Sequence, residues 1–405
     1  MKPLRRSPEK VRLPKGFLFS ALAAEIKASG RPDLALVEVA GGAIAAALST
    51  TNRVVAAPVD VGRISLQATG GRVRAVVVNS GNANCATGPA GRQACERICR
   101  EAGNLLGAPA AEIFPSSTGI IGVPLPAEKI IAKLPRLVSA KSAREKDALA
   151  FARAIMTTDT RPKVASARFR TGAREVTLLG VAKGAGMIHP QLATMLVYLC
   201  TDAVAAPREL QSLLRETCDQ TFNCMSIDGD TSTNDTVLLL ANGQSGLALR
   251  GVRVRTKFAE SLLHVCQSLA EQIISDGEGV QHVIRLSVEQ AGSREEALRV
   301  ARAIAHSALV KTAWAGADPN WGRVLMAVGA SGVPVDPTRI RIFIGGQLVC
   351  RNGIACAFDQ KRAHRNLAQP VCDIRVQLGR GRSAVQFLTT DLTTEYVRIN
   401  AEYST

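Results

Sequence analysis

Residues 183–196 read KGAGMIHPQLATML, and this stretch constrains the chain more than any other. It follows an apolar run typical of a strand, bends at glycines and a proline, and places Thr194 at the head of a second apolar run. A threonine hydroxyl is a weak nucleophile unless a base lies beside it, and cleavage of the chain just before it would supply its own α-amino group as that base. We therefore interpret Ala193-Thr194 as a self-cleavage point.

Size and composition are those of a globular protein. The chain has 405 residues, a length sufficient for one large or two ordinary domains. Hydrophobic residues make up 46% of it and charged residues 21%, which is typical of globular proteins. No apolar run is long enough for a transmembrane helix. The cysteines are scattered without a C-x-x-C pair or a nearby histidine, so we expect free thiols and no metal site.

The N-terminal stretch has some features of a signal peptide. Basic residues precede an apolar segment at 16–24, but this segment is short and a helical pattern continues through Lys27. We expect a cytoplasmic protein.

The net charge is +16, which raises nucleic-acid binding as an alternative function. The basic residues are spread along the whole chain, however, and aromatic residues make up only 4%. A stacking platform for single strands is therefore not expected. Salt-dependent binding to nucleic acid would reopen this alternative.

Apolar runs alternate with helical patterns, which predicts a mixed α/β fold with a β-rich C-terminal third. We predict one helix over 297–310, capped by Ser293, and hairpins at Gly345-Gly346 and at Gly379–Gly381. The G-x-S-x-G, Walker, H-E-x-x-H and complete G-x-G-x-x-G motifs are not found.

Polar clusters rich in Thr, Asn, Asp and Gly adjoin the apolar runs. Each is typical of a turn, but together they predict one hydrogen-bonding site built from distant loops. These clusters are 50–52, 79–84, 116–119, 157–160, 227–236, 316–323 and 398–400.

The same clusters carry a family resemblance over nearly the whole chain, from about Gly16 to Thr405. The chain resembles the ornithine acetyltransferases, or glutamate N-acetyltransferases, of arginine biosynthesis. The most specific pieces are 79–84, 117–122, 156–160, 183–196, 228–242 and 316–323.

The resemblance implies a layered α/β/β/α sandwich and self-cleavage between Ala193 and Thr194. It implies an α chain of residues 1–193 and a β chain of residues 194–405, assembled as a heterotetramer of two α and two β chains. The exposed Thr194 would be the nucleophile, with Thr118 and Gly119 as the oxyanion hole. Substrate-binding positions would be Thr157, Lys183, Thr194, Glu278, Asn400 and Thr405.

The implied reaction moves an acetyl group from N2-acetyl-L-ornithine to L-glutamate through an acetyl-threonine ester, without a bound cofactor. Some relatives also accept acetyl-CoA, and no residue here decides whether this chain does. A hydrolase or aminopeptidase with an N-terminal threonine uses the same chemistry and remains an alternative. It would release product without an acceptor amine.

The chain departs from the family pattern just before the nucleophile. The family usually has Ala-Pro-Asn-Met-Ala-Thr, whereas this chain has His189, Gln191 and Leu192 at the first, third and fourth of these positions. The Ala-Thr bond is kept. The bulky, titratable His189 would lie close to the cleavage turn.

Overall fold

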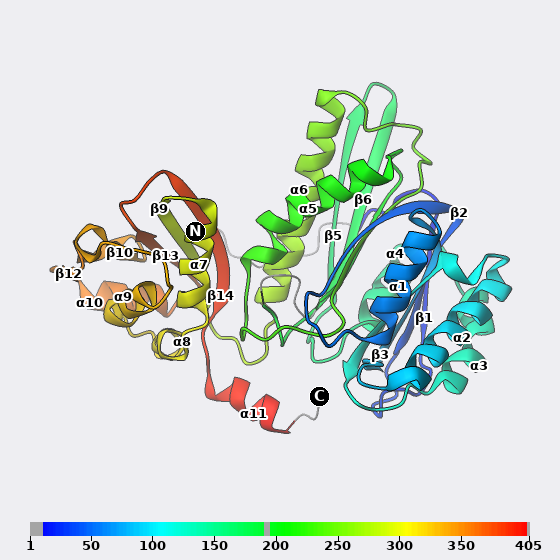
Figure 1. Ribbon diagram of the computed structural model, residues 1–405, viewed down its shortest axis with the longest axis horizontal. Coiled ribbons are helices and arrows are strands. Elements are labelled where there is room, and N and C mark those ends of the chain that lie inside the picture. Colours follow the sequence, from blue (N-terminus) through cyan, green and yellow to red (C-terminus); the bar gives the residue numbers. More distant parts are fainter. Residues whose placement is uncertain (1–10, 190–194, 403–405) are drawn as a thin grey trace.

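The computed structural model describes residues 11–189 and 195–402 and contains two sheets in two bodies that lie side by side (Figure 1). The larger body holds an eight-stranded sheet and the smaller one a six-stranded sheet. This confirms the predicted mixed α/β class.

The larger body is formed by residues up to 274 of the described chain. Its strands are β1 (Phe17–Leu22), β2 (Leu34–Ser49), β3 (Arg72–Asn82), β4 (Ile113–Ile120), β5 (Lys163–Thr171), β6 (Arg174–Lys183), β7 (Leu196–Thr201) and β8 (Thr236–Ala241). Its helices are α1 (Ala57–Ala68), α2 (Gly88–Leu106), α3 (Ala127–Ser139), α4 (Glu145–Ala154), α5 (Pro207–Gln220) and α6 (Val252–Ile274), with short 3₁₀ turns at Ala110–Glu112 and Phe222–Cys224.

The eight-stranded sheet folds back on itself at β2. Strand order is β4-β3-β2-β8-β7-β6-β5, with β1 also paired to β2. The first half of β2 pairs with β1 and β3, and the second half pairs with β8. A register shift between Glu38 and Ala43 separates the halves, and Gly42 there adopts a φ of 75° that favours glycine.

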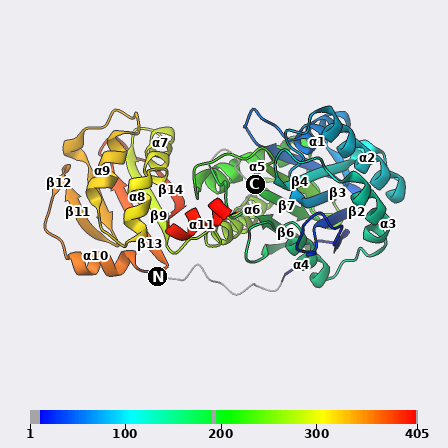
Figure 2. The same cartoon turned by 90° about the horizontal axis from the view of Figure 1, so that it is seen from below.

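Side chains that alternate along the strands fill the layers made by this bend. Phe19, Val37, Tyr198 and Leu238 share one core between the two halves of the sheet. Their neighbours in sequence point outward, toward α2 and α3 on one side and toward α5 and α6 on the other. Figure 2 shows the resulting order of layers, α/β/β/α, across the larger body.

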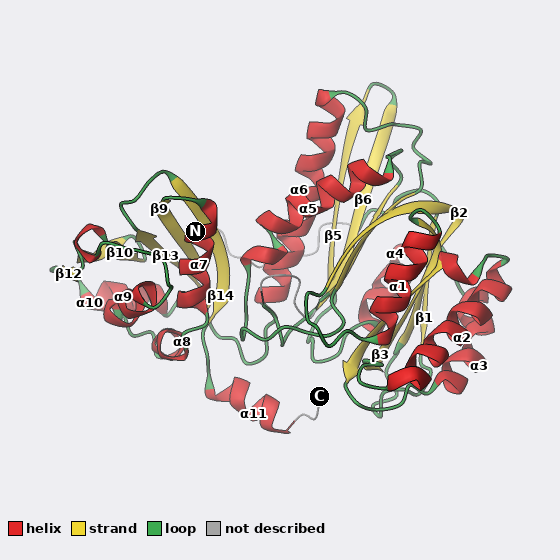
Figure 3. Ribbon diagram, viewed as in Figure 1, coloured by secondary structure: helices red, strands yellow, loops and turns green. Residues whose placement is uncertain are grey.

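The smaller body contains the C-terminal third. Its sheet has the order β12-β11-β10-β13-β9-β14 and is covered by α7 and α9. Its elements are β9 (Val283–Ala291), α7 (Arg294–Ala305), α8 (Ala308–Ala315), α9 (Trp321–Gly329), a 3₁₀ turn (Pro337–Arg339), β10 (Arg341–Ile344), β11 (Gln347–Arg351), β12 (Ile354–Ala355), α10 (Gln360–Leu367), β13 (Val371–Gln377), β14 (Ser383–Thr390) and α11 (Thr394–Glu402). Three consecutive helices, α7 to α9, separate β9 from the strands β10 to β12 (Figure 3).

Three local predictions are wrong. Residues 17–22 form buried strand β1 rather than part of a helical pattern, because Phe17 and Phe19 enter the core between the sheet halves. The helix predicted over 297–310 is two helices, since the Ser307 hydroxyl caps a new one by accepting from the Val310 amide. The hairpin at Gly379–Gly381 does not form, because β9 lies between β13 and β14.

Candidate active site

A cavity of about 330 Å³ lies where loops of the larger body meet α11. It collects every predicted site residue within the described part of the chain, namely Thr118, Gly119, Thr157, Lys183, Glu278 and Asn400. Ala193, Thr194 and Thr405 lie outside the described residues. The cavity lies beside the end of β6 and the start of β7, the strands that flank the predicted cleavage point.

Thr118 and Gly119 reach the cavity through close pairing of β3 and β4. Gly119 has a φ of 133°, and a Cβ atom there would lie 2.3 Å from the carbonyl carbon of Gly81. Only glycine fits this approach. The Ser117 hydroxyl donates to Asn79 Oδ1 at 2.6 Å and fixes the preceding residue. The strand geometry thus aims the Thr118 side chain at the cavity wall.

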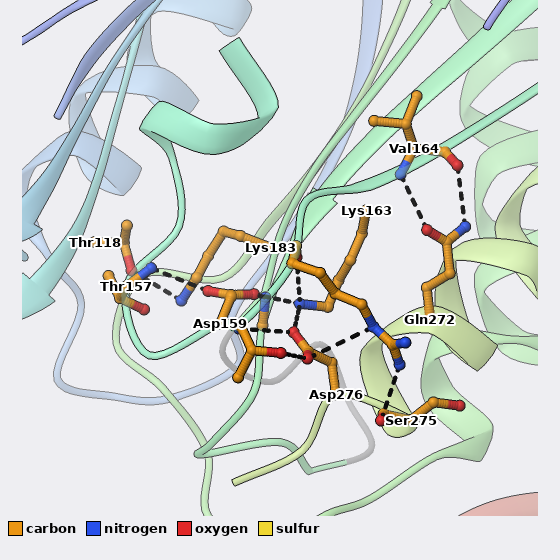
Figure 4. Close-up of polar contacts among 12 residues, drawn as sticks. Thr118, Thr157, Asp159, Lys163, Val164, Lys183, Gln272, Ser275 and Asp276 are labelled. Carbon is orange, nitrogen blue, oxygen red and sulfur yellow. Dashed lines mark hydrogen bonds and ion pairs between the residues drawn. The ribbon is translucent and has the colours of Figure 1, made fainter. Parts of the chain in front are cut away.

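Lys183, the last residue of β6, contributes its side chain to the same wall of the cavity. Its side chain is buried, and Nζ donates to Thr118 Oγ1 at 3.2 Å (Figure 4). Burial lowers the pKa of Lys183, the Asp159 carboxylate opposes this effect, and the Lys163 ammonium adds to it. Because Oγ1 accepts from the ammonium, the hydroxyl proton of Thr118 stays available for another acceptor.

A buried ion cluster supports Lys183 from behind. Lys163 Nζ lies 2.6 Å from Asp159 Oδ1 and 2.6 Å from Asp276 Oδ2 (Figure 4). Burial alone would raise the pKa of Asp159, but Lys163 and Lys183 lower it below its ordinary range. Sequence reasoning missed Lys163 and Asp276. The available signal was a lysine that opens a strand four residues after a conspicuous aspartate.

Asp159 also ties two loops of the cavity together. Its carboxylate accepts from the amides of Thr157 at 3.0 Å and Gly184 at 2.7 Å. One buried side chain therefore holds the Thr157 loop and the end of β6 in register. The cluster Thr157–Thr160 was predicted from sequence, but this bridging role was not.

Asp228 holds the backbone that leads to the predicted cleavage segment. Its carboxylate accepts from the amides of Met187 at 2.5 Å and Ile188 at 2.9 Å. Met187 has a φ of 58°, which is unusual for a residue other than glycine. Burial raises the pKa of Asp228 to about 6.

Asp235 performs a similar task on the other side of the predicted cleavage segment. Its Oδ1 accepts from the Met195 amide at 2.9 Å, and its side chain is buried. Burial raises the pKa of Asp235 well above its ordinary value. Carboxylates thus hold both described ends of the segment that contains the predicted cleavage point.

The cavity carries charges of both signs. Its lining includes Lys183 and the three acids Asp228, Asp230 and Glu278. Glu278 Oε2 accepts from Asn400 Nδ2 at 2.9 Å, which connects α11 to the cavity. Figure 2 shows α11 between the two bodies. Groups of both signs are therefore available in one cavity for a ligand that carries an ammonium and a carboxylate.

Not every predicted cluster joins this site. Cluster 50–52 stands behind it: Thr50 Oγ1 donates to the Ser232 carbonyl at 2.6 Å, and Asn52 Nδ2 donates to the Thr231 carbonyl at 3.0 Å. Cluster 316–323 belongs to the smaller body and lines a separate groove, so its predicted place in a single site is wrong. The reason is that β9 belongs to a second sheet, which packs against α7 in a core of its own.

The described residues contain neither a metal-ligand cluster nor a candidate membrane span. In that part of the chain, no group of three or more His, Cys, Asp or Glu side chains is arranged to hold a metal ion. None of the helices within 11–189 and 195–402 has the length and apolar character needed to cross a bilayer.

Comparison with known proteins gives matches over nearly the full length. The ArgJ family model matches residues 18–405. The arginine biosynthesis bifunctional protein ArgJ of Thermus thermophilus is 46% identical over 396 residues, which cover 98% of this chain and 100% of that protein.

Two solved structures are also similar in sequence. One is the bifunctional protein ArgJ of Bacillus halodurans, at 38% identity, covering 50% of this chain and 96% of that chain with a TM-score of 0.48. The other is the ornithine acetyltransferase of Mycobacterium tuberculosis complexed with ornithine, at 36% identity, covering 45% and 94% with a TM-score of 0.39. The extent of the family match and the identity to the Thermus protein establish that this chain belongs to the ArgJ family.

Proposed function

We propose that this chain cleaves itself before Thr194 and then moves an acetyl group from N2-acetyl-L-ornithine to L-glutamate in the cytoplasm. Membership of the ArgJ family makes it an acetyltransferase of arginine biosynthesis. The observation that carries the detailed proposal is the cavity beside the end of β6 and the start of β7, which gathers Thr118, Gly119 and Lys183.

The first half-reaction forms an acetyl-enzyme. The Thr194 hydroxyl oxygen attacks the acetyl carbonyl carbon, and its proton passes to the α-amino group created by cleavage. The Thr118 hydroxyl and the Gly119 amide donate to the negative oxygen that develops. The carbon–nitrogen bond of the acetamide then breaks, the proton returns to the departing nitrogen, and ornithine leaves.

The second half-reaction reverses these steps with another amine. The α-amino group of glutamate attacks the acetyl-threonine ester, the threonine oxygen leaves and takes a proton, and N-acetylglutamate forms. The Lys183 ammonium lies beside the Thr118 hydroxyl, so its charge favours the oxyanion in both halves. Thr157, Glu278, Asn400 and Thr405 are the proposed substrate contacts.

Cleavage would leave an α chain of residues 1–193 and a β chain of residues 194–405. Strands β6 and β7 pair antiparallel, with Lys183 opposite Leu196. The two pieces would therefore stay joined within one sheet. We propose an assembly of two α and two β chains, and acetyl-CoA as an additional acetyl donor, which an assay with acetyl-CoA and glutamate alone would test.

Intact mass spectrometry tests the proposal directly. The wild type should give two polypeptides separated before Thr194, and incubation with N2-acetyl-ornithine should add one acetyl group to the C-terminal piece. Thr194→Ala should remain a single chain without acetylation, while Thr256→Ala, at an exposed position of α6, should behave as the wild type. A wild type that is active in one piece would refute the proposal. Release of more than one equivalent of ornithine per active site without glutamate would identify a hydrolase instead, because the proposed exchange stops at the acetyl-enzyme when no acceptor amine is present.

A further inference from the structure

The polar cluster 316–323 lines an open groove of about 790 Å³ in the smaller body. One wall comes from the connection between α8 and α9, and the other from the first turns of α10. None of these lining residues lines the cavity described above. Ligand sites commonly occupy roughly 300–1,000 Å³, so the groove is large enough for a small molecule.

Local hydrogen bonds give the groove a defined shape. Asn320 Oδ1 caps α9 by accepting from the Arg323 amide at 3.2 Å, while its Nδ2 donates to Asp318 Oδ2 at 3.1 Å. The ring nitrogen Nδ1 of His364 lies 2.9 Å from the Ala317 carbonyl oxygen. The two walls are thus connected, and the Asp318 carboxylate is held at the rim.

Aromatic rings line both walls. Trp321 comes from the start of α9 and Phe358 from just before α10, and both are half-buried against the core of the smaller body. Aromatic residues are only 4% of this chain, so two in one groove are a notable concentration. Half-exposed rings of this kind stack on flat ligands such as nucleobases.

Basic side chains of α10 face the same space. Lys361, His364 and Arg365 stand at i, i+3 and i+4 and share one side of the helix. All three are exposed, and neither Lys361 nor Arg365 has an ion-pair partner in the described part of the chain. An anion is the natural counterpart of these unpaired charges, and arginine suits phosphate in particular.

The three kinds of lining group correspond to the three parts of a nucleotide. We propose that this groove binds a purine nucleoside diphosphate. The base stacks on Trp321, the diphosphate lies against Lys361 and Arg365, and the Asp318 carboxylate accepts from the ribose hydroxyls, as acidic residues do in other nucleotide sites. Free nucleotides and the nucleotide portion of coenzyme A share this chemistry.

Tryptophan fluorescence provides a direct binding test. The chain has two tryptophans, and Trp314 is buried at 2% exposure while Trp321 lines the groove. Titration of the full-length protein with ADP should give saturable quenching that the Trp321→Phe variant lacks. Absence of saturable quenching in the wild type would overturn the proposal.

A matched pair of variants tests where the charges act. The variant Arg365→Glu, which changes the net charge by the same amount as the control, should weaken ADP binding at least tenfold. Arg362→Glu, on the same helix but outside the groove, should change it less than twofold. Equal weakening by both would reveal a general charge effect and refute the site. Acetyl exchange should be unchanged in both variants, which shows that they are folded and separates this test from that of the proposed function.

Competition experiments identify the class of ligand that binds the groove and distinguish a free nucleotide from coenzyme A. Pyrophosphate that competes as well as ADP, or an oligonucleotide that binds much more tightly than ADP, would overturn the proposal. Coenzyme A binding at least as tightly as ADP would support the proposal and assign the coenzyme as the source. Binding of ADP but not of coenzyme A would also support it and assign a free nucleotide.

Discussion

Lys183 Nζ lies 3.2 Å from Thr118 Oγ1, although β6 and β4 are separated by four strands in the order of their sheet. In a flat sheet, five steps of about 4.8 Å would separate such strands by roughly 24 Å. The bend of β2 stacks the two halves and brings the strand ends together. The contact between Thr118 and Lys183 therefore depends on a backbone irregularity that is far from both residues in the sequence.

Removal of the Thr118 hydroxyl is expected to impair turnover more than binding. Thr118→Ala should lower kcat by about 10²–10³-fold with little change in KM, because an oxyanion donor acts mainly in the transition state. Steady-state kinetics of acetyl exchange measures both. Thr118→Ser keeps the hydroxyl and should retain most of the activity. An unchanged kcat in the alanine variant would exclude the oxyanion role.

Loss of the buried Lys163 ammonium is expected to destabilise the fold. Lys163→Met leaves Asp159 and Asp276 buried without their shared cation, and should lower the free energy of unfolding by about 3–5 kcal/mol. Guanidinium denaturation measures the change. Lys146→Met, at an exposed position of α4, serves as control. Asp276→Asn should recover part of the loss in the Lys163→Met background, and no recovery would argue against an electrostatic cause.

His306 is expected to make stability fall in acid. The pKa of His306 is lowered from 6.5 to about 4. Burial is the largest cause, and the nearby His189, Lys311 and Arg302 add smaller effects in the same direction. Between these values the unfolded chain binds a proton that the folded chain does not, so stability falls as pH decreases from about 6.5 to 4. The buried Asp228 carboxyl acts in the opposite direction over part of this range.

A variant separates the two groups. His306→Gln should lose less stability than the wild type between pH 6.5 and 4, as measured by Tm at a series of pH values. Its ring contact with His189, at 4.8 Å between centroids, is lost at all pH values and shifts the whole curve. Curves of identical shape for the two proteins would show that His306 does not titrate as argued.

Asp230 is expected to favour the cationic substrate. It lines the cavity, is exposed, and has no ion-pair or hydrogen-bond partner for its carboxylate in the described part of the chain. Asp230→Asn should raise KM for N2-acetyl-ornithine about two- to fivefold and lower KM for glutamate, since an exposed pair contributes about 0.2–1 kcal/mol.

The uncharged analogue N2-acetyl-norvaline isolates this effect, because it lacks the side-chain ammonium. Its KM should be the same in the wild type and Asp230→Asn. Glu260→Gln, which removes a charge from the exposed face of α6, is the matched control. Changes in the same direction for ornithine and glutamate substrates would point to a structural role of Asp230.

Local patterns in the chain were sufficient for several features. Continuous apolar runs at 73–78 and 237–241 predict β3 and β8, and helical spacing of apolar residues at 91–106, from 207 and at 258–274 predicts α2, α5 and α6. The predicted cap at Ser293 is also present. Their information lies within a few residues, which is the range over which propensity and periodicity act. The resemblance to a family added Thr118, Gly119, Thr157, Lys183, Glu278 and Asn400, and all of them line one cavity.

Other features required the folded chain. Nothing local indicates that Lys163 meets Asp276, which is 113 residues away, or that β9 separates β13 from β14. The same holds for the separation of cluster 316–323 from the clusters that line the cavity. Residue types and their spacing thus specified elements and candidate chemistry. The tertiary structure determines which of these candidate residues lie together, through the bend of β2 and the separate core of the smaller body. Side chains that are distant in sequence come together only when the apolar faces of the elements pack.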